Sequence, residues 1–331
     1  MTVNARAPVR IDFAGGWSDV PIYADEHGGS VLNAAIGLYA RVECTPGGGR
    51  FRIHAEDIGE RVSVGTPAKL VYDGKLDLHK AAINMLPVLG GVEIISNSDV
   101  PAGSGLGASG SLDVALLAAL AACREETYPS TELAEMGYAL EAEELGMLGG
   151  RQDQYAAAVG GFNHLRFGKE HIDAKKLSVS ADAAAELEQC TEVVYTGQSH
   201  FSSETHERVW NAYQSGLAEV TDAIHTMRDL VNPATDALMA GQWRALAALI
   251  DENWRQQQRL DATISTEGTK RIETAARAAG AWGVKAAGSG AGGCLVIIGD
   301  PATALERERT VTDAGGQVLA WQFDFDGVTT W

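Results

Sequence analysis

Residues 99–111 hold the densest group of residues that could do chemistry. The segment runs Asp-Val-Pro-Ala-Gly-Ser-Gly-Leu-Gly-Ala-Ser-Gly-Ser. An apolar run typical of a strand precedes it at 92–96, and an apolar run with helical spacing follows it at 112–123. Glycines let a backbone approach a ligand closely, and the free N–H groups of a first helical turn attract anions. The segment therefore predicts a phosphate-binding loop at the start of a buried helix.

Ser109 stands where that helix should begin. Its hydroxyl could ligate a metal ion bound to phosphate, or it could simply cap the helix. A Walker A loop is excluded because no lysine follows these glycines. Residues 105–110 and 288–293 both match the dinucleotide pattern G-x-G-x-x-G, but neither joins a strand directly to a helix. A Rossmann-type NAD-dependent oxidoreductase is therefore the less favoured alternative.

The composition limits the partners of this chain. Its 331 residues have room for two domains, and 26 basic against 44 acidic residues give a formal net charge of −18. Such a surface repels nucleic acids and anionic membranes, so we expect neither as a partner. Four scattered cysteines lack metal-ligand spacing, and no segment resembles a signal peptide or a membrane span. We therefore expect a protein of the reducing cytoplasm.

The order of apolar patterns predicts an α+β fold. In the first half we expect strands at 7–13, 30–42 and 50–54, with the three glycines at 47–49 as a hairpin tip. A helix should begin after Pro129 and end near Gly146, with Glu141 at the edge of its apolar stripe. A shift in composition near 168–176 predicts two domains, 1–170 and 171–331.

The second half should form a small antiparallel α+β unit. The expected elements are helices at 181–189, 202–231, 233–250, 268–279 and 302–313 and strands at 192–196, 284–286, 295–298 and 318–323.

Three glycine loops, at 7–19, 101–109 and 283–293, together resemble the three motifs of the GHMP small-molecule kinases, in the family's order. The resemblance spans nearly the whole chain. It implies the GHMP two-domain fold, with an N-terminal domain like domain 2 of ribosomal protein S5 and a ferredoxin-like C-terminal domain. The active site would lie in the cleft between them.

Within that superfamily, Phe-Ala-Gly-Gly-Trp-Ser-Asp at 13–19 and Gly-Arg-Gln-Asp-Gln at 150–154 are similar to the D-glycero-D-manno-heptose 7-phosphate kinases and the L-fucokinases. This resemblance implies an ATP-dependent kinase that phosphorylates a sugar hydroxyl, the anomeric one, of a free or 7-phosphorylated fucose- or heptose-type acceptor. The alternative is a non-catalytic sensor of sugar and nucleotide with the same fold. The expected partners are the sugar and ATP, in a monomer or a homodimer.

The resemblance also implies the role of each site residue. Asp153 would be the general base, and Arg10 would stabilise the transferred phosphoryl group. Ser109 and Glu141 would hold Mg²⁺, with Glu143 as the fallback for Glu141. The ATP loop would comprise Pro101, Gly103, Ser104, Gly105, Leu106, Gly107, Ala108 and Ser109, joined by Gly290. The acceptor would be bound by Asp19, Trp17, Gly16 and His200.

Simpler roles for these residues stay open. Asp153 could cap a helix at 154–159, and Glu141 could be a solvated helix residue. Arg10 could pair with Asp12 or Asp19, Lys285 could lie on the surface, and Trp17 could be core or sugar platform.

The acceptor pocket departs from the family pattern. An arginine often follows Thr-Gly-x-x in the family, but His200 stands there in this chain, with Thr205 and His206 near it. A distal phosphate prefers a fixed cation such as arginine. A free sugar is therefore slightly favoured over a phosphorylated one.

Overall fold

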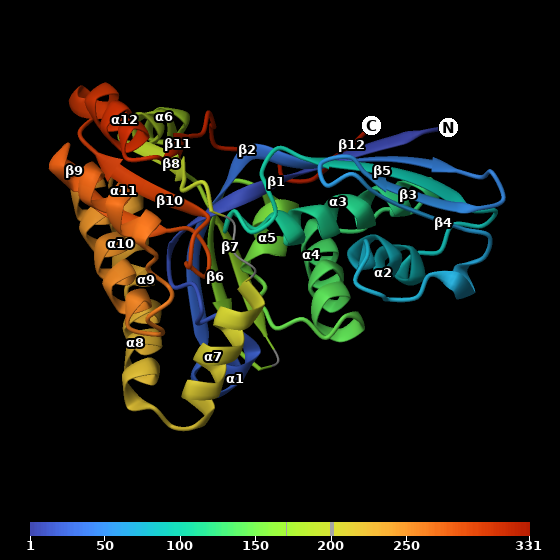
Figure 1. The fold of residues 1–331 in the computed structure, drawn as a ribbon, viewed down its shortest axis with the longest axis horizontal. Helices are drawn as coiled ribbons and strands as arrows, with labels where there is room; N and C mark the ends of the chain where they lie inside the picture. Colours follow the sequence, from blue (N-terminus) through green and yellow to red (C-terminus); the bar gives the residue numbers. More distant parts are fainter. Residues whose placement is uncertain (170, 199–201) are drawn as a thin grey trace.

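The computed structural model describes residues 1–169, 171–198 and 202–331. Its first half is built on an eight-stranded sheet in the order β12-β1-β2-β5-β3-β4, with β6 paired to β2 and β7 paired to β6 (Figure 1). The strands are β1 (Val3–Ala14), β2 (Gly29–Pro46), β3 (Phe51–Ala55), β4 (Glu60–Val64), β5 (Val92–Ser98), β6 (Phe162–Phe167), β7 (Ile172–Leu177) and β12 (Thr329–Thr330). Only the β3–β5 pairing is parallel; the other described pairings are antiparallel.

Helices cover one face of this sheet (Figure 1). They are α2 (Asp77–Met85), α3 (Ala108–Cys123), α4 (Ser130–Ala139), the π-helical turn η2 (Leu140–Glu144) and α5 (Gln152–Val159). The short helix α1 (Pro21–His27) and the turn η1 (Pro67–Lys69) complete this half.

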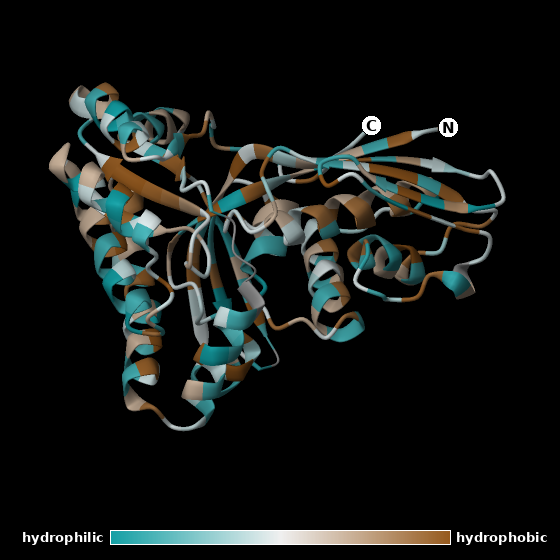
Figure 2. Ribbon diagram, in the orientation of Figure 1, coloured by the Kyte–Doolittle hydropathy of each residue, from teal (hydrophilic) through white to brown (hydrophobic). Residues whose placement is uncertain are grey.

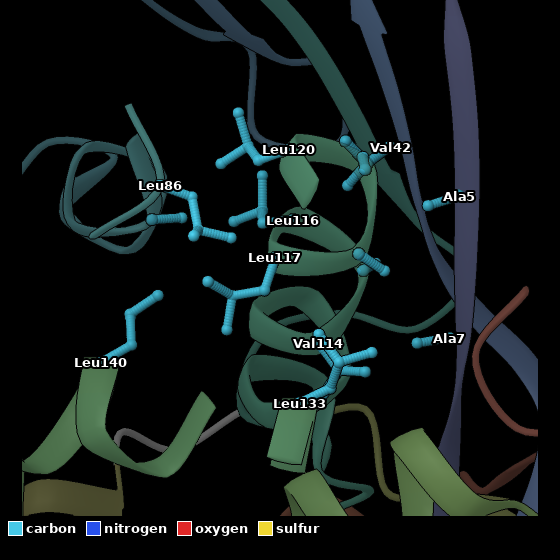
Figure 3. Packing of buried hydrophobic residues seen from close by; sticks show 14 of the residues in the cluster. Ala5, Ala7, Val42, Leu86, Val114, Leu116, Leu117, Leu120, Leu133 and Leu140 are labelled. Carbon is cyan, nitrogen blue, oxygen red and sulfur yellow. The ribbon is translucent and has the colours of Figure 1, made fainter. Parts of the chain in front are cut away.

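The core of the first half surrounds α3. This helix is apolar on nearly every side, so it is buried rather than amphipathic. Figure 3 shows Leu116, Leu117 and Leu120 pointing away from α3 into the surrounding layer. The N-terminus of α3 is thereby held in a fixed position by a well-packed core.

The second half contains a four-stranded antiparallel sheet in the order β11-β8-β10-β9. The strands are β8 (Thr191–Tyr195), β9 (Ala281–Ala286), β10 (Cys294–Gly299) and β11 (Gln317–Val318). Numbered along the chain, this order is 4-1-3-2, which is the ferredoxin-like arrangement, so the predicted fold of this half is confirmed.

The second half also contains a set of helices. They are α6 (Ala181–Cys190), α7 (Ser202–Gln214), α8 (Ala218–Asp229), α9 (Val231–Met239), α10 (Trp243–Gln258), α11 (Glu267–Ala278), the turn η3 (Pro301–Thr303) and α12 (Ala304–Asp313). Some of them pack on this sheet and some, such as α7, on other helices. Strand β10 is fully buried and uniformly apolar between them (Figure 2). No helix in the described ranges is both long and apolar enough to cross a membrane.

Four expectations differ from the structure. The expected helix at 233–250 is two helices, α9 and α10. The glycines at 47–49 are not a hairpin tip, because β5 inserts between β2 and β3. The expected strand at 318–323 is only Gln317–Val318, and Phe323 instead forms an isolated bridge to Ile36. The expected helix at 202–231 is interrupted between α7 and α8.

The predicted division at 170/171 falls inside the β6–β7 hairpin, and β12 returns to pair with β1. Both ends of the chain therefore contribute to the first sheet. The division stays a prediction.

Candidate functional site

The glycine loop of residues 101–107 joins β5 to α3 and opens onto a cleft. Gly103, Gly105 and Gly107 all have positive φ, near 75°. Helix α3 begins at Ala108, and Gly107 precedes it in the left-handed conformation without a side-chain cap. Ser109 is therefore not the helix cap, and its side chain lines the cleft beside the first-turn amides. Free amides at a helix N-terminus are suited to bind phosphate.

The last glycine loop packs directly against this first one. A Cβ at Gly105 would lie 2.2 Å from the carbonyl oxygen of Ala287, and the amide of Cys294 donates to the carbonyl oxygen of Ser104 at 2.7 Å. Gly290 lines the same cleft as Gly103. Two loops whose contacting residues are more than 180 positions apart in sequence therefore form one wall of backbone.

Arg10 lies beside these two loops and connects β1 to α5. Its Nε and Nη2 both reach Asp153 Oδ1, at 2.8 and 2.7 Å, and its Nη1 donates to the carbonyl oxygen of Gly105 at 2.5 Å. A Cβ at Gly110 would lie 2.7 Å from the Cβ of Asp153. Asp153 therefore lies against the first turn of α3.

Asp153 does not cap its helix. Helix α5 begins at Gln152 and is preceded by Arg151, so Asp153 lies inside the first turn. The pairing of Arg10 with Asp12 or Asp19 is likewise wrong, because its described ion pair is with Asp153.

Asp19 is buried in the loop that follows β1 and lines the same cleft. The amide of Gln152 donates to its Oδ2 at 3.2 Å. Burial, reinforced by the negative charge of Asp153, raises the pKa of Asp19 to about 7. Gly150 packs so closely that its Cβ would lie 1.9 Å from the same oxygen. The carboxylate is therefore held by backbone on two sides.

A buried ion pair supports the site from below. Lys285 Nζ on β9 lies 2.9 Å from Asp12 Oδ2 on β1, and both side chains are about 1% exposed. Lys285 is therefore not a surface lysine, and burial lowers its pKa. Position 16 next to this pair requires glycine, because a Cβ there would lie 2.2 Å from Asp12 Oδ2. The pair links the two halves of the molecule beneath the cleft.

Glu141 meets the requirements for a ligand of a divalent cation. It is buried on the π-helical turn η2, lines the cleft with Ser109, and its Oε2 accepts from Gln154 Nε2 at 2.7 Å. Its Oε1 is buried without a described hydrogen-bond partner. Burial raises its pKa, which a cation would reverse. An unpartnered carboxylate oxygen beside a hydroxyl fits the oxygen preference of Mg²⁺.

Two other acidic residues near Glu141, Glu143 and Asp113, differ in burial. Glu143, the fallback ligand, is exposed and does not line the cleft. Asp113, one helical turn after Ser109, is fully buried, and burial together with the charge of Glu141 raises its pKa well above its usual value. Sequence reasoning missed Asp113, although its spacing of four from Ser109 puts both on one face of α3.

Trp17 and His206 form an aromatic pair in the cleft. Trp17 has a positive φ of 76°, and its ring stacks on His206 of α7 with centroids 4.5 Å apart. Trp17 lines the cleft and also belongs to the hydrophobic core, where it packs against Trp210. Gln152, which the sequence analysis did not single out, lines the cleft beside them.

Known proteins resemble the chain along its whole length. The model of the GHMP kinases N terminal domain matches residues 74–161, and that of the GHMP kinases C terminal matches residues 234–316. A D-glycero-alpha-D-manno-heptose 7-phosphate kinase of Campylobacter jejuni is 30% identical over 341 residues, which cover 100% of this chain and 99% of that protein. The chain belongs to the GHMP kinase family.

Two further relatives agree with this assignment. The crystal structure of a D-glycero-D-manno-heptose 1-phosphate kinase from Bacteroides thetaiotaomicron has a TM-score of 0.83 and 28% identity, over 99% of this chain and 98% of that one. A bifunctional fucokinase/GDP-fucose pyrophosphorylase of Arabidopsis thaliana is 28% identical over 91% of this chain but only 30% of its own length. The predictions of a GHMP kinase, its α+β fold and an ATP-dependent kinase are confirmed, and the Rossmann alternative is wrong.

Two site predictions for this GHMP kinase lie outside the cleft, and a third falls on a residue that the structure does not describe. Pro101 is exposed and Leu106 is buried in the core, where its carbonyl accepts from the Arg10 amide at 2.8 Å, and neither lines the cleft. Their contact with ATP stays a prediction. His200 lies outside the described residues.

Proposed function

We propose that this kinase transfers the γ-phosphoryl group of ATP to the anomeric hydroxyl of a heptose- or fucose-type sugar. The observation that carries the proposal is the contact of Arg10 with Asp153 at 2.7 Å, at the mouth of the glycine loop. The names of the relatives support it: one is a heptose 7-phosphate kinase, another is a heptose 1-phosphate kinase, and a third is an L-fucokinase/L-fucose-1-P guanylyltransferase of Bacteroides fragilis, of which this chain covers 36%.

Asp153 would accept the proton of the attacking hydroxyl. Both contacts from Arg10 end on Oδ1, so Oδ2 remains for the acceptor. A base must lie within hydrogen-bond reach of the proton that it removes, and a fixed carboxylate meets this condition at low entropic cost. Arg10 would thus orient the base and contribute positive charge beside the transferred group.

The glycine loops would bind the nucleotide. Amides of residues 103–109 at the N-terminus of α3 would hold the phosphates, and Gly290 would lie beside them. Ser109 and Glu141 would hold Mg²⁺, which neutralises phosphate charge when it is bound. Asp19 would accept hydrogen bonds from sugar hydroxyls. We expect the enzyme in the cytoplasm, where its free cysteines stay reduced, as a monomer or homodimer.

The test is a coupled assay of ATP turnover on a panel of free and phosphorylated L-fucose, hexoses and heptoses, with phosphorus NMR to identify the phosphorylated position. Asp153→Asn should lower kcat by roughly 10²–10⁴-fold, because general-base catalysis contributes about that much. Calorimetric binding of Mg·ATP should be unchanged in this variant. Binding of sugar and nucleotide by the unaltered chain without turnover would instead identify the sensor alternative.

A further inference from the structure

The acceptor part of the cleft is walled by side chains from both halves of the molecule. Trp17 follows β1, Gln152 begins α5, and His206 belongs to α7. All three line the same cleft as Asp19 and Asp153. The wall is therefore adjacent to both groups to which the proposed function assigns the acceptor.

Each residue of this wall holds a buried polar atom without a partner in the described structure. These atoms are Trp17 Nε1, Gln152 Oε1 and His206 Nδ1. Buried polar groups in folded proteins are nearly always hydrogen-bonded, because an unpaired one is costly. All three belong to residues that line one cleft, and a ligand with both donors and acceptors would supply the missing bonds.

The charge of the described lining disfavours a second anionic group on that ligand. Arg10 is the one lysine or arginine among the described lining residues, and it already binds Asp153 and Gly105. The lining also carries carboxylates, and burial lowers the pKa of His206 to about 4, so this imidazole is neutral at physiological pH. A phosphate at the far end of the acceptor is bound best by fixed cations, which the described lining does not provide there.

We propose that the acceptor is an uncharged sugar whose hydroxyls are bound by Trp17, Gln152 and His206. The inference rests on the proposed sugar-kinase function and narrows it. The chain would then differ in substrate from its Campylobacter jejuni relative, whose name specifies a heptose 7-phosphate.

Matched acceptors test the charge of the substrate. With the unaltered enzyme, kcat/KM for D-glycero-D-manno-heptose or L-fucose should exceed that for the corresponding phosphorylated sugar by at least about tenfold, since one missing cationic contact has that effect. A preference for heptose 7-phosphate would overturn the inference and leave the proposed function standing. Turnover of neither form, with Mg·ATP still bound, would mean that the proposed function itself fails.

Variants of His206 test whether this side chain binds the sugar. His206→Phe keeps an aromatic ring against Trp17 but removes Nδ1, so KM for the free sugar should rise by about tenfold while KM for ATP and the melting temperature stay unchanged. His206→Asn, which restores a polar atom, should recover part of the loss and serves if the phenylalanine variant folds poorly. His171→Phe, at an exposed position before β7, is the matched control. An unchanged KM for the free sugar in both His206 variants would overturn the assignment.

Discussion

At the scale of single residues, the site depends on groups whose surroundings change their ordinary chemistry. Asp19 is a carboxyl group with a pKa near 7 because it is buried beside another carboxylate. Trp17 adopts a backbone conformation that side chains rarely take, and it thereby faces His206. Such strain and desolvation gather at functional sites, where binding of a ligand compensates for them.

The raised pKa of Asp19 predicts how the free enzyme responds to pH. The folded state holds the proton up to about pH 7, whereas the unfolded chain releases it near 3.8, so folding binds protons between these values. The free energy of unfolding should therefore fall as the pH rises from 5 to 8, by roughly 2–4 kcal/mol for this group. Urea titrations across that range measure it. Asp19→Asn should flatten the profile, and an equally steep profile in that variant would contradict the assignment.

The close packing of Gly150 predicts a selective loss of acceptor binding. Gly150→Ala places a methyl group 1.9 Å from Asp19 Oδ2, so the carboxylate must move. We expect KM for the sugar to rise at least tenfold, with calorimetric binding of Mg·ATP unchanged. Gly149→Ala is the matched control, because a Cβ there meets nothing within 4 Å. Equal behaviour of the two variants would refute this role of Gly150.

At the scale of elements, loops and turns carry the residues of the site, and buried helices and strands hold those loops in place. The N-terminus of α3 is fixed because the rest of that helix is core. Glu141 reaches the cleft from a π-helical turn, where the carbonyl of Glu141 accepts from the Met147 amide at 2.9 Å. π-helical turns are frequent at functional sites because they redirect one side chain within a helix. Helical periodicity placed Glu141 at the edge of a stripe but did not predict this turn.

The contact between the two glycine loops predicts that neither tolerates a side chain. Gly105→Ala should weaken ATP binding at least tenfold, since its Cβ would lie 2.2 Å from the carbonyl oxygen of Ala287. Gly59→Ala, in the turn before β4, has a similar positive φ and nothing within 4 Å, so it controls for backbone strain alone. Calorimetry with Mg·ATP measures both. If the two variants bind equally well, contact between the loops is not needed for the nucleotide site.

At the scale of the whole molecule, the two halves are joined through their interiors. Lys285 on β9 and Asp12 on β1 form a fully buried pair, and the C-terminal strand β12 returns to β1. Buried charges are stable only when they are paired, so this contact fixes how the halves meet. The cleft is lined by residues of both halves.

Removal of one partner of this pair should destabilise the whole protein. Lys285→Met leaves the Asp12 carboxylate buried without its cation, at a cost of roughly 3–5 kcal/mol in the free energy of unfolding. The double variant Asp12→Asn/Lys285→Met should recover part of that loss, because no charge is then left unpaired. Denaturant titration measures the unaltered protein, the two single variants and the double variant. Additive losses in the double variant would show that the two residues do not act as a pair.

The amino-acid sequence by itself determined the local features and their order. It predicted the strand, glycine loop and buried helix at 92–123 and the family, because these depend on neighbouring residues and on motifs in a fixed order. Only the tertiary structure decided which distant residues meet. The partners of Arg10 and Lys285, the stacking of Trp17 on His206, and the insertion of β5 beside β3 join residues 41 to 273 positions apart. Local propensity carries no information on such pairings, since they depend on how whole elements pack.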